Sequence, residues 1–443
     1  MVRVEARSRK GRASLHTLGC RLNQYETQKM EDSLRAAGYR IVPFGEPADL
    51  GVINTCTVTR QADAKCRAEI RKFIRRNPEA VTVVTGCYSQ MGYKEIASIP
   101  GVDYIIGNQD KLNLLEYVDG EKTDRPVVVR DRIDKRDFSI SVWGDLPFNK
   151  RANLKIQDGC DFGCSFCIIP RARGRARARL FGNLMEEAHH WVGRGVRELV
   201  LTGVNLGTWK EEGMEFLDLV DALDGIPGLD RIRISSIEPT TIPEALLDRM
   251  ADPVHAVLPY LHIPLQSGSD SVLQDMGRRY GLSEYLDFLD LAQARVEGLC
   301  IGTDILVGYP TETEALFEET CRTFLSGPFA YCHVFTFSER KGTRAARYPI
   351  EQQVPMEERQ RRSARLRRLS AQKRHDYFAD HLGREVEVLF ENPRESSWPG
   401  YTGNYIRVVV PDSGEDLRNR VGRVRLERVS ADFVEGCLLE MLD

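Results

Sequence analysis

Three closely spaced cysteines constrain this chain more than any other feature of its sequence. Cys160, Cys164 and Cys167 follow the pattern C-x3-C-x2-C, and no fourth cysteine or histidine follows closely. A structural zinc site is closed by four ligands, and a fully ligated iron–sulfur cluster also takes four. Three thiolates on one loop therefore predict a cubane cluster whose open iron holds a small molecule. The alternatives are a zinc knuckle with a distant fourth ligand, or reduced structural thiols.

Length and composition narrow the class of protein. The 443 residues suffice for two to four domains, and 42% hydrophobic with 29% charged residues is typical of a soluble globular protein. The net charge of −3 means that any nucleic-acid surface must be local. Eleven scattered cysteines do not indicate a small disulfide scaffold. Neither a signal core nor a run of about 18 apolar residues is present. We therefore expect a reduced, cytoplasmic protein without membrane contact.

The N-terminal third alternates short strands with helices. We expect strands over residues 13–19, 50–53, 80–85 and 102–107, and helices over residues 22–37, 60–76 and 108–118. This alternation predicts an α/β fold with a doubly wound parallel sheet.

Three cysteines of this region each lie just past a predicted strand. They are Cys20, Cys56 and Cys87. The carboxyl ends of parallel strands share one edge of a sheet, where ligand crevices form. The pattern predicts a second three-thiolate cluster, against the alternative that each thiol is a buried small hydrophobe. Cys66 has apolar helical spacing, and we assign it to the core.

The alternation repeats from residue 151 to about residue 340. We expect strands at 153–157, 196–201, 231–235, 259–263, 299–306 and 331–336, and helices at 183–193, 214–224, 242–250, 283–295 and 313–325. This favours a partial α/β barrel over an open sheet, and barrel enzymes work at the carboxyl ends of their strands. Polar candidates for binding a small molecule lie there: Thr202, Gly203, Asn205, Ser235, Glu238, Gln266 and Asp304. Helix caps and turns are the alternative roles for such residues.

Arginines gather in two places against the nearly neutral background. One run alternates directly after the cysteine loop: Arg171, Arg173, Arg175, Arg177 and Arg179. The other lies on a predicted long helix at about 356–381: Arg359, Arg361, Arg362, Arg365, Arg367, Arg368, Lys373 and Arg374. Such density can neutralise phosphates, although a solvated face balanced by acids is the usual alternative.

The C-terminal tail changes to short strands. We expect them at 385–390, 405–410, 420–427 and 431–440, with residues 391–404 as a connection that contains Pro393, Pro399, Gly400 and Gly403. About 60 residues of short strands predict a small antiparallel barrel. Tyr401 and Tyr405 with Arg407 would offer such a barrel stacking and charge for nucleic acid.

Together these motifs resemble the methylthiotransferases of the radical-SAM superfamily over nearly the whole chain. The resemblance lies in Cys160–Pro170 with Arg173-Gly174-Arg175, in the segments around Cys20, Cys56 and Cys87, and in Gly383–Val388 with Gly400–Tyr405, which resembles the family's TRAM barrel. It implies an N-terminal methylthiotransferase domain at 1–135, a radical-SAM core at 145–378 and a TRAM RNA-binding domain at 379–443.

Further segments are similar to the MtaB-type branch, which adds a methylthio group to C2 of N6-threonylcarbamoyladenosine next to the tRNA anticodon. They are Asn23–Thr27, Arg233–Pro239, His333–Phe335 and Arg340–Thr343. Two residues depart from the family pattern. Thr311 stands where glycine is common, which matters if that turn needs positive φ, and Ala178 stands where serine is common.

The resemblance implies two [4Fe–4S] clusters and S-adenosylmethionine (SAM) as cofactors. Cys160, Cys164 and Cys167 would hold the cluster that binds SAM, and Cys20, Cys56 and Cys87 the auxiliary cluster that carries the sulfur. The seven polar residues at the barrel mouth become candidates for the SAM pocket. Partners would be a tRNA anticodon stem-loop, a one-electron reductant and a sulfur donor, and we expect a monomer.

Two alternatives to this function stay open at the level of the sequence. The same chemistry could act on isopentenyladenosine in tRNA or on a ribosomal protein aspartate. A non-catalytic protein that binds metal and RNA is the alternative of a different class.

Overall fold

The computed structural model describes residues 11–141, 144, 151–412 and 414–442. The described residues form two compact units. The first contains the residues up to 144 together with 155–183 and 338–346, and the second contains 151–154, 184–337 and 347–442. The predicted boundaries at 1–135, 145–378 and 379–443 stay a prediction. No helix in the described part of the chain is long and apolar enough to span a membrane.

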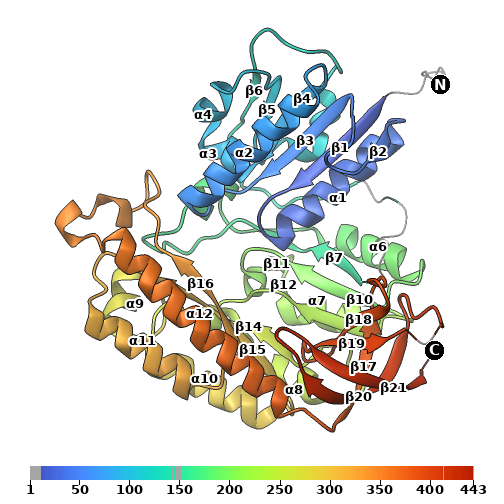
Figure 1. Ribbon diagram of the computed structural model, residues 1–443, viewed down its shortest axis with the longest axis vertical. Coiled ribbons are helices and arrows are strands. Elements are labelled where there is room, and N and C mark those ends of the chain that lie inside the picture. Colours follow the sequence, from blue (N-terminus) through green and yellow to red (C-terminus); the bar gives the residue numbers. More distant parts are fainter. Residues whose placement is uncertain (1–10, 142–143, 145–150, 413, 443) are drawn as a thin grey trace. The chain divides into compact units, whose positions relative to one another are not determined.

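The first unit is built on a six-stranded parallel sheet in the order β2-β1-β3-β4-β5-β6. Its strands are β1 (Arg12–Thr17), β2 (Arg40–Val42), β3 (Leu50–Thr55), β4 (Val81–Gly86), β5 (Tyr104–Ile106) and β6 (Val127–Val129). Its helices are α1 (Arg21–Ala36), α2 (Arg60–Arg76), α3 (Cys87–Met91) and α4 (Tyr93–Ala97). The doubly wound parallel sheet is confirmed, with helices on both faces (Figure 1).

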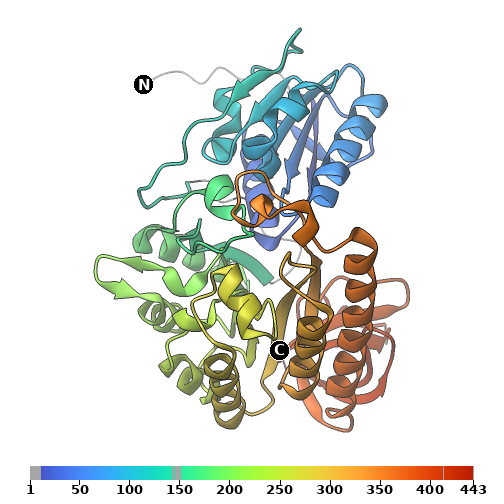
Figure 2. The ribbon, with the colours of Figure 1, turned by 90° about the vertical axis from the view of Figure 1, so that its left-hand side faces the viewer.

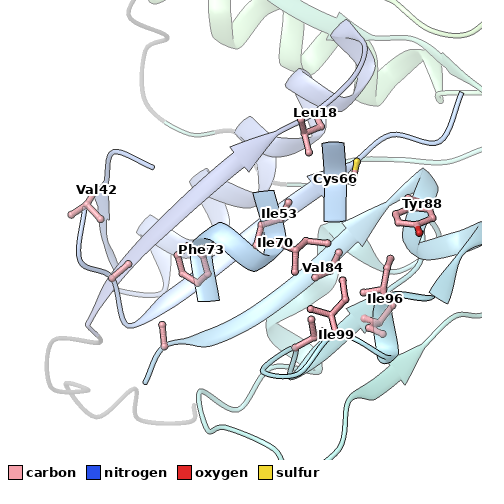
Figure 3. Close-up of a cluster of buried hydrophobic side chains, with 14 residues drawn as sticks. Leu18, Val42, Ile53, Cys66, Ile70, Phe73, Val84, Tyr88, Ile96 and Ile99 are labelled. Carbon is pink, nitrogen blue, oxygen red and sulfur yellow. The ribbon is translucent and has the colours of Figure 1, made fainter. Parts of the chain in front are cut away.

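Two apolar layers hold this sheet. On one face α2 contributes Cys66, Ile70 and Phe73, which pack over Ile53 and Val84 of the strands (Figure 3). Cys66 is fully buried there, as the core assignment predicted. The other face packs against α1 and against a 3-10 turn, η1 (Lys111–Glu116). The helix predicted at 108–118 is a shorter 3-10 helix, η1. The short edge strands β2 and β6 were not predicted.

Three later elements complete the first unit. They are β8 (Gln157–Asp158), α5 (Ile169–Arg173) and β9 (Arg177–Ala178), with β8 and β9 paired antiparallel. Between β8 and α5 runs the loop with the three closely spaced cysteines. The segment 338–346 also belongs to this unit, although it comes much later in the sequence.

The second unit carries six core strands in two sheets, β13-β10-β7 and β14-β15-β16. The strands are β7 (Arg151–Lys155), β10 (Glu198–Thr202), β13 (Arg231–Ile234), β14 (Tyr260–His262), β15 (Cys300–Val307) and β16 (Tyr331–Thr336). A parallel bridge from Ile232 to Val257, just before β14, connects the sheets. The strands therefore follow one another in chain order, as a partial barrel requires. Two very short strands, β11 (Lys210–Glu211) and β12 (Met214–Glu215), form a hairpin outside these sheets.

Helices alternate with these strands. They are α6 (Phe181–Val192), α7 (Phe216–Asp224), α8 (Ala245–Ala251), α9 (Asp270–Met276), α10 (Leu282–Arg295) and α11 (Glu314–Ser326). Of these, only α9 was not predicted. The long helix α12 (Met356–Ala379) packs along β16, beside α11 (Figure 2).

The tail closes into a barrel in the order β17-β18-β19-β21-β20. Its strands are β17 (Glu385–Phe390), β18 (Ser397–Thr402), β19 (Arg407–Pro411), β20 (Val421–Val429) and β21 (Val434–Met441). The predicted small barrel is confirmed, and its pairs are antiparallel except for β19 with β21, which is parallel. Residues 391–404 are not only a connection, because β18 lies within them.

Candidate functional site

Three cysteines follow three adjacent strands of the first sheet. Cys20 is the N-cap of α1 directly after β1, Cys56 follows β3, and Cys87 follows β4 and opens α3. The strand order reverses between β1 and β3. In doubly wound sheets such a switch point leaves a crevice at the carboxyl edge, where ligands bind. The sequence-based placement of these three cysteines on one edge therefore agrees with the topology.

Close backbone packing brings these loops together. Gly19 has φ +107, and a Cβ there would lie 2.8 Å from the Cys56 Cβ and 3.1 Å from its Sγ. Gly86 has φ +99, and a Cβ there would lie 2.4 Å from the Thr55 oxygen. Both positions need glycine for conformation and for space.

Burial holds the Cys56 thiol of this edge in its protonated form. Burial raises the pKa of Cys56 to about 12, and the neighbouring Cys87 and Cys20 act in the same direction. Burial likewise raises the pKa of Cys66 to about 11. Across the described residues, no three His, Cys, Asp or Glu side chains are already arranged to hold a metal ion. A cluster would therefore have to replace thiol protons and turn these side chains toward itself.

The second cysteine loop is tied by backbone hydrogen bonds. Cys160 donates its N–H to the Gly174 oxygen at 3.1 Å, and Cys167 donates to the Cys164 oxygen at 3.2 Å. Gly159, at φ +73, approaches the Arg175 oxygen so closely that a Cβ would lie 2.0 Å from it. Cys160, Cys164 and Cys167 are half-buried.

The segment 338–346 braces that loop within the first unit. Ala345 donates its N–H to the Ser165 oxygen at 2.8 Å, and Arg344 reaches the Gly163 oxygen at 3.0 Å. Arg340 of the same segment pairs with Asp63 at 2.7 Å and donates to Thr57, which follows Cys56 directly. One segment thus contacts the neighbourhoods of both cysteine sets.

A buried group of charges lies in the same unit as the two cysteine sets. We call it the charge network: Glu26, Lys111, Lys155, Asp158 and Arg173. The Arg173 guanidinium donates to both Glu26 oxygens at 3.0 Å and to Asp158 at 3.1 Å. The Lys155 ammonium donates to Glu26 at 2.9 Å and to Asp158 at 2.6 Å, and Lys111 donates to Glu26.

The network keeps its carboxylates ionised. Burial acts to raise the pKa of Glu26, but Arg173, Lys111 and Lys155 hold it well below its usual range. Burial acts to lower the pKa of Arg173, but Cys87, Glu26 and Asp158 raise it overall. Burial lowers the pKa of Lys111. No sequence signal connected Glu26 with Arg173, because the two are 147 positions apart and neither lies in a ligand motif.

The arginine run after the cysteine loop is mostly internal. Arg173 and Arg179 are 2% and 0% exposed, and Arg179 donates to Asn183 at 2.9 Å. Only Arg171 and Arg175 of the run are exposed. The prediction of a phosphate-binding run was therefore wrong for its buried members. Ala178 is buried as well, so that position offers no surface for a phosphate.

Four SAM-pocket candidates lie past β10 and β13 in the second unit. Asn205 is buried, and its side-chain oxygen accepts from the Glu238 N–H at 3.1 Å and from the Thr241 hydroxyl at 2.9 Å. Glu238 pairs with Arg278, and burial raises the pKa of Glu238 although Arg278 opposes this. Thr202 ends β10, where its hydroxyl donates back to the Val200 oxygen. Ser235 follows β13 and is half-buried.

The other three SAM-pocket candidates are Gly203, Gln266 and Asp304. Gly203 follows β10 directly. Gln266 has φ +71 and bridges to Ile305 of β15. Asp304 pairs with His262 at 2.9 Å, and although burial acts to raise the pKa of Asp304, His262 holds it below its usual range. Six of the seven predicted residues thus lie at or just past strand ends, whereas Asp304 lies within β15. Most of them already bond one another or a neighbour.

The turn with Thr311 does not need a positive φ at that residue. Gly308, at φ +75, supplies the left-handed position instead. The departure at Thr311 is therefore compatible with the fold of the turn.

The tail tyrosines pack on the core of the second unit. Tyr401 and Tyr405 stack with ring centroids 5.0 Å apart. Arg151 lies over Tyr401 at 5.2 Å, and Arg233 lies over Tyr405 at 5.1 Å. Arg407 pairs with Asp432 at 3.1 Å. The aromatic pair predicted to stack on nucleic acid instead forms an internal contact between barrel and core.

The chain is similar in sequence to known protein families and to individual proteins. Residues 12–107 match the model of "Uncharacterized protein family UPF0004", and residues 154–324 match that of the "Radical SAM superfamily". The threonylcarbamoyladenosine tRNA methylthiotransferase MtaB of Bacillus subtilis is 37% identical over 97% of both chains. The chain belongs to the radical SAM tRNA methylthiotransferase family.

A further relative is similar in sequence, and a solved structure is similar in fold. A tRNA-2-methylthio-N(6)-dimethylallyladenosine synthase of Cereibacter sphaeroides is 32% identical over 94% of this chain and 95% of its own. The radical S-adenosylmethionine methyltransferase TsrM of Kitasatospora setae shares the fold, with a TM-score of 0.53 and 15% identity over 73% of each chain.

As a family member, the chain is a transferase that uses SAM and two [4Fe–4S] clusters, and its substrate class is tRNA. The residues present fit those cofactors in their chemistry. Six cysteines stand in two sets of three within one compact unit, one set past strand ends and the other on a loop, and both sets are held by close glycine contacts. Thiolates are the protein ligands of such clusters.

Proposed function

We propose that this methylthiotransferase acts on N6-threonylcarbamoyladenosine beside the tRNA anticodon and places a methylthio group on C2 of the adenine. The placement of both cysteine sets in one compact unit supports the chemistry. The names of the relatives that are 32–37% identical over nearly the whole chain support the substrate. A tRNA loop is single-stranded, so its bases can be splayed out for reaction.

We assign Cys160, Cys164 and Cys167 to the SAM-binding cluster and Cys20, Cys56 and Cys87 to the auxiliary cluster. When bound, the first cluster supplies the electron that cleaves SAM and the second supplies the sulfur. The chain's own residues fix the two loops, through Gly159 on one side and Gly19 with Gly86 on the other. The seven candidates of the second unit, Thr202, Gly203, Asn205, Ser235, Glu238, Gln266 and Asp304, are proposed to bind SAM.

The remaining parts of the proposal concern partners. The reaction needs a one-electron reductant and a sulfur donor, and a tRNA substrate implies a cytoplasmic location. The domains at 1–135, 145–378 and 379–443 would then be the auxiliary-cluster, radical-SAM and TRAM parts. A monomer suffices, because all six cysteines come from one chain.

Nucleoside mass spectrometry tests the substrate. We expect cells without the gene to lose 2-methylthio-N6-threonylcarbamoyladenosine and to regain it on complementation. Unchanged levels would refute the proposed substrate. Loss of the 2-methylthio form of the isopentenyl nucleoside instead would establish the other tRNA branch.

Single-cysteine variants test the two ligand sets. We expect anaerobically purified protein to hold about eight irons per chain. Cys164→Ala should abolish formation of 5′-deoxyadenosine from SAM. Cys56→Ala should keep part of that activity but add no methylthio group to tRNA. Cys66→Ala, which removes the adjacent core thiol, is the matched control and should keep both clusters. If Cys56→Ala still modifies tRNA, the auxiliary assignment is wrong.

A further inference from the structure

The charge network carries more positive than negative charge. Three cations, Lys111, Lys155 and Arg173, face two carboxylates, Glu26 and Asp158, and all five side chains are at most 6% exposed. Arg177, also nearly buried, adds a further cation 3.8 Å from Asp158. A buried charge without a counter-ion is strongly unfavourable. The network therefore lacks at least one negative charge.

The excess positive charge of the network lies beside Cys87. Asn108 accepts from the Lys111 ammonium at 2.8 Å through its side-chain oxygen. Its side-chain nitrogen then faces the Cys87 sulfur at 3.5 Å and the Ala172 oxygen at 2.6 Å. An amide has one accepting and one donating end, so the lysine contact fixes which end meets the sulfur. Arg173 directly follows Ala172 and interacts electrostatically with Cys87.

A cluster held by three thiolates would supply the missing charge. A [4Fe–4S]²⁺ core with three thiolates carries one net negative charge, and one-electron reduction adds a second. Hydrogen bonds and charges around the sulfurs tune the reduction potential of such clusters. Cations fixed nearby favour the reduced form.

We propose that Lys111, Arg173 and Asn108 are positioning residues that balance the charge of the auxiliary cluster at Cys87 and raise its reduction potential. This proposal rests on the assignment of Cys87 as a ligand of that cluster. Glu26 and Asp158 hold the cations in place from α1 and β8. A purely structural network would hold the same elements together without any effect on the potential.

The test isolates the auxiliary cluster in the full-length chain. The background carries Cys160→Ala, Cys164→Ala and Cys167→Ala, so that only Cys20, Cys56 and Cys87 remain to hold iron. In this background we compare Lys111→Met and Asn108→Leu. Lys122→Met is the matched control, because Lys122 belongs to the same unit but binds the Ala80 oxygen at the amino end of β4.

Redox titration followed by electron paramagnetic resonance gives the result. At a fixed potential we expect Lys111→Met to lower the ratio of reduced to oxidised cluster about tenfold, which is about 59 mV for one electron. Asn108→Leu should lower it in the same direction by a smaller factor, and Lys122→Met should leave it unchanged. Equal ratios in all four proteins, at unchanged iron content, would overturn the proposal.

A second measurement separates this proposal from the assignment on which it rests. Iron and sulfide analysis of the background protein should give about four irons per chain. If the background holds no iron, the auxiliary-cluster assignment fails. If Lys111→Met loses its iron, Asn108→Leu gives the decisive titration, because it removes no charge from the network.

Discussion

Two glycines near the same cysteine loop differ in whether a side chain could replace them. Gly159 has φ +73 and lies against the Arg175 backbone, whereas a Cβ on Gly163 would meet nothing within 4 Å. Positive φ alone costs a non-glycine residue roughly 1 to 2 kcal/mol, and the clash adds to it. We expect Gly159→Ala to lower both stability and iron content, as measured by thermal unfolding and iron analysis.

Gly163→Ala provides the control for that prediction. It should retain the parent's iron content and unfold within a few degrees of it. Equal behaviour of the two variants would show that close approach at Gly159 does not shape the loop.

At this scale the sequence predicted the positions of the six cysteines better than the contacts around them. Cys160, Cys164 and Cys167 stand out by their close spacing, and Cys20, Cys56 and Cys87 by their position just past predicted strands. Arg173 was predicted to face phosphates, but it turns inward to Glu26, which is 147 positions away. Local charge density is the same for a buried and an exposed arginine, so only the tertiary partner separates the two cases.

The strand β13 carries a buried ion pair that joins core to barrel. Arg233 donates to Glu198 of β10 at 2.7 Å and to the Gly403 oxygen at 2.9 Å. Burial acts to raise the pKa of Glu198, but Arg233 lowers it to about 2, against 4.5 for a free glutamate. Because the folded-state pKa is depressed, the stabilisation is complete above pH 4.5 and is lost as the pH falls toward 2.

We therefore expect the unfolding free energy of the apoprotein to fall by about 3 kcal/mol between pH 4.5 and 2 on account of Glu198. Urea unfolding across this range measures it, and Glu198→Gln should remove that part of the slope. Glu387→Gln is the control, since Glu387 is largely exposed beside Arg231. A parent slope that persists in Glu198→Gln would contradict the pairing.

The arginines of helix α12 differ in burial and in their partners. Arg359 and Arg362 are buried, and Arg361 and Arg365 pair with Glu358, Glu314 and Glu318. Arg367 and Arg368 are exposed and form no ion pair within the described ranges. If α12 contacts tRNA, these two residues are its free cations.

We expect Arg367→Ala with Arg368→Ala to weaken tRNA binding and to reduce the slope of log affinity against log salt by about one for each phosphate that the variant no longer neutralises. Fluorescence anisotropy at several salt concentrations measures both quantities. Arg361→Ala, whose charge is already paired, should change the slope less. An unchanged slope in the double variant would place the tRNA elsewhere.

Helices and strands were predictable from the sequence where the local residue pattern and the end signals agreed. Residues 60–76 form α2 at the predicted bounds, because an N-cap threonine and Pro78 mark its ends. Strand β18 was missed because Pro399 and Gly400 lie within it. Gly400 is needed there, since a Cβ would lie 2.4 Å from a Val388 methyl of the neighbouring strand. Such a cross-strand constraint is invisible in the local sequence.

In the second unit as a whole, the C-terminal barrel packs directly against the core. Tyr405 lies against Tyr260 at 4.6 Å, and Tyr377 of α12 donates to the Asn404 oxygen at 3.3 Å. We expect a chain that ends after Ala379 to lose thermal stability and SAM cleavage together, not merely tRNA affinity. Differential scanning calorimetry and 5′-deoxyadenosine formation check this. A truncated chain with unchanged stability and cleavage would show that the barrel is an independent module.

The ion pair between Arg340 and Asp63 has a consequence for synthesis on the ribosome. The two residues are 277 positions apart, yet Asp63 is buried and accepts a hydrogen bond from Thr57, the residue after Cys56. At roughly 5 to 20 residues per second, Asp63 emerges some 14 to 55 s before its partner exists. For the first part of that interval, until residue 173 is made, the nascent N-terminal sheet also lacks Arg173. The N-terminal unit is translated first, yet its contacts are complete only after residue 340 has been made.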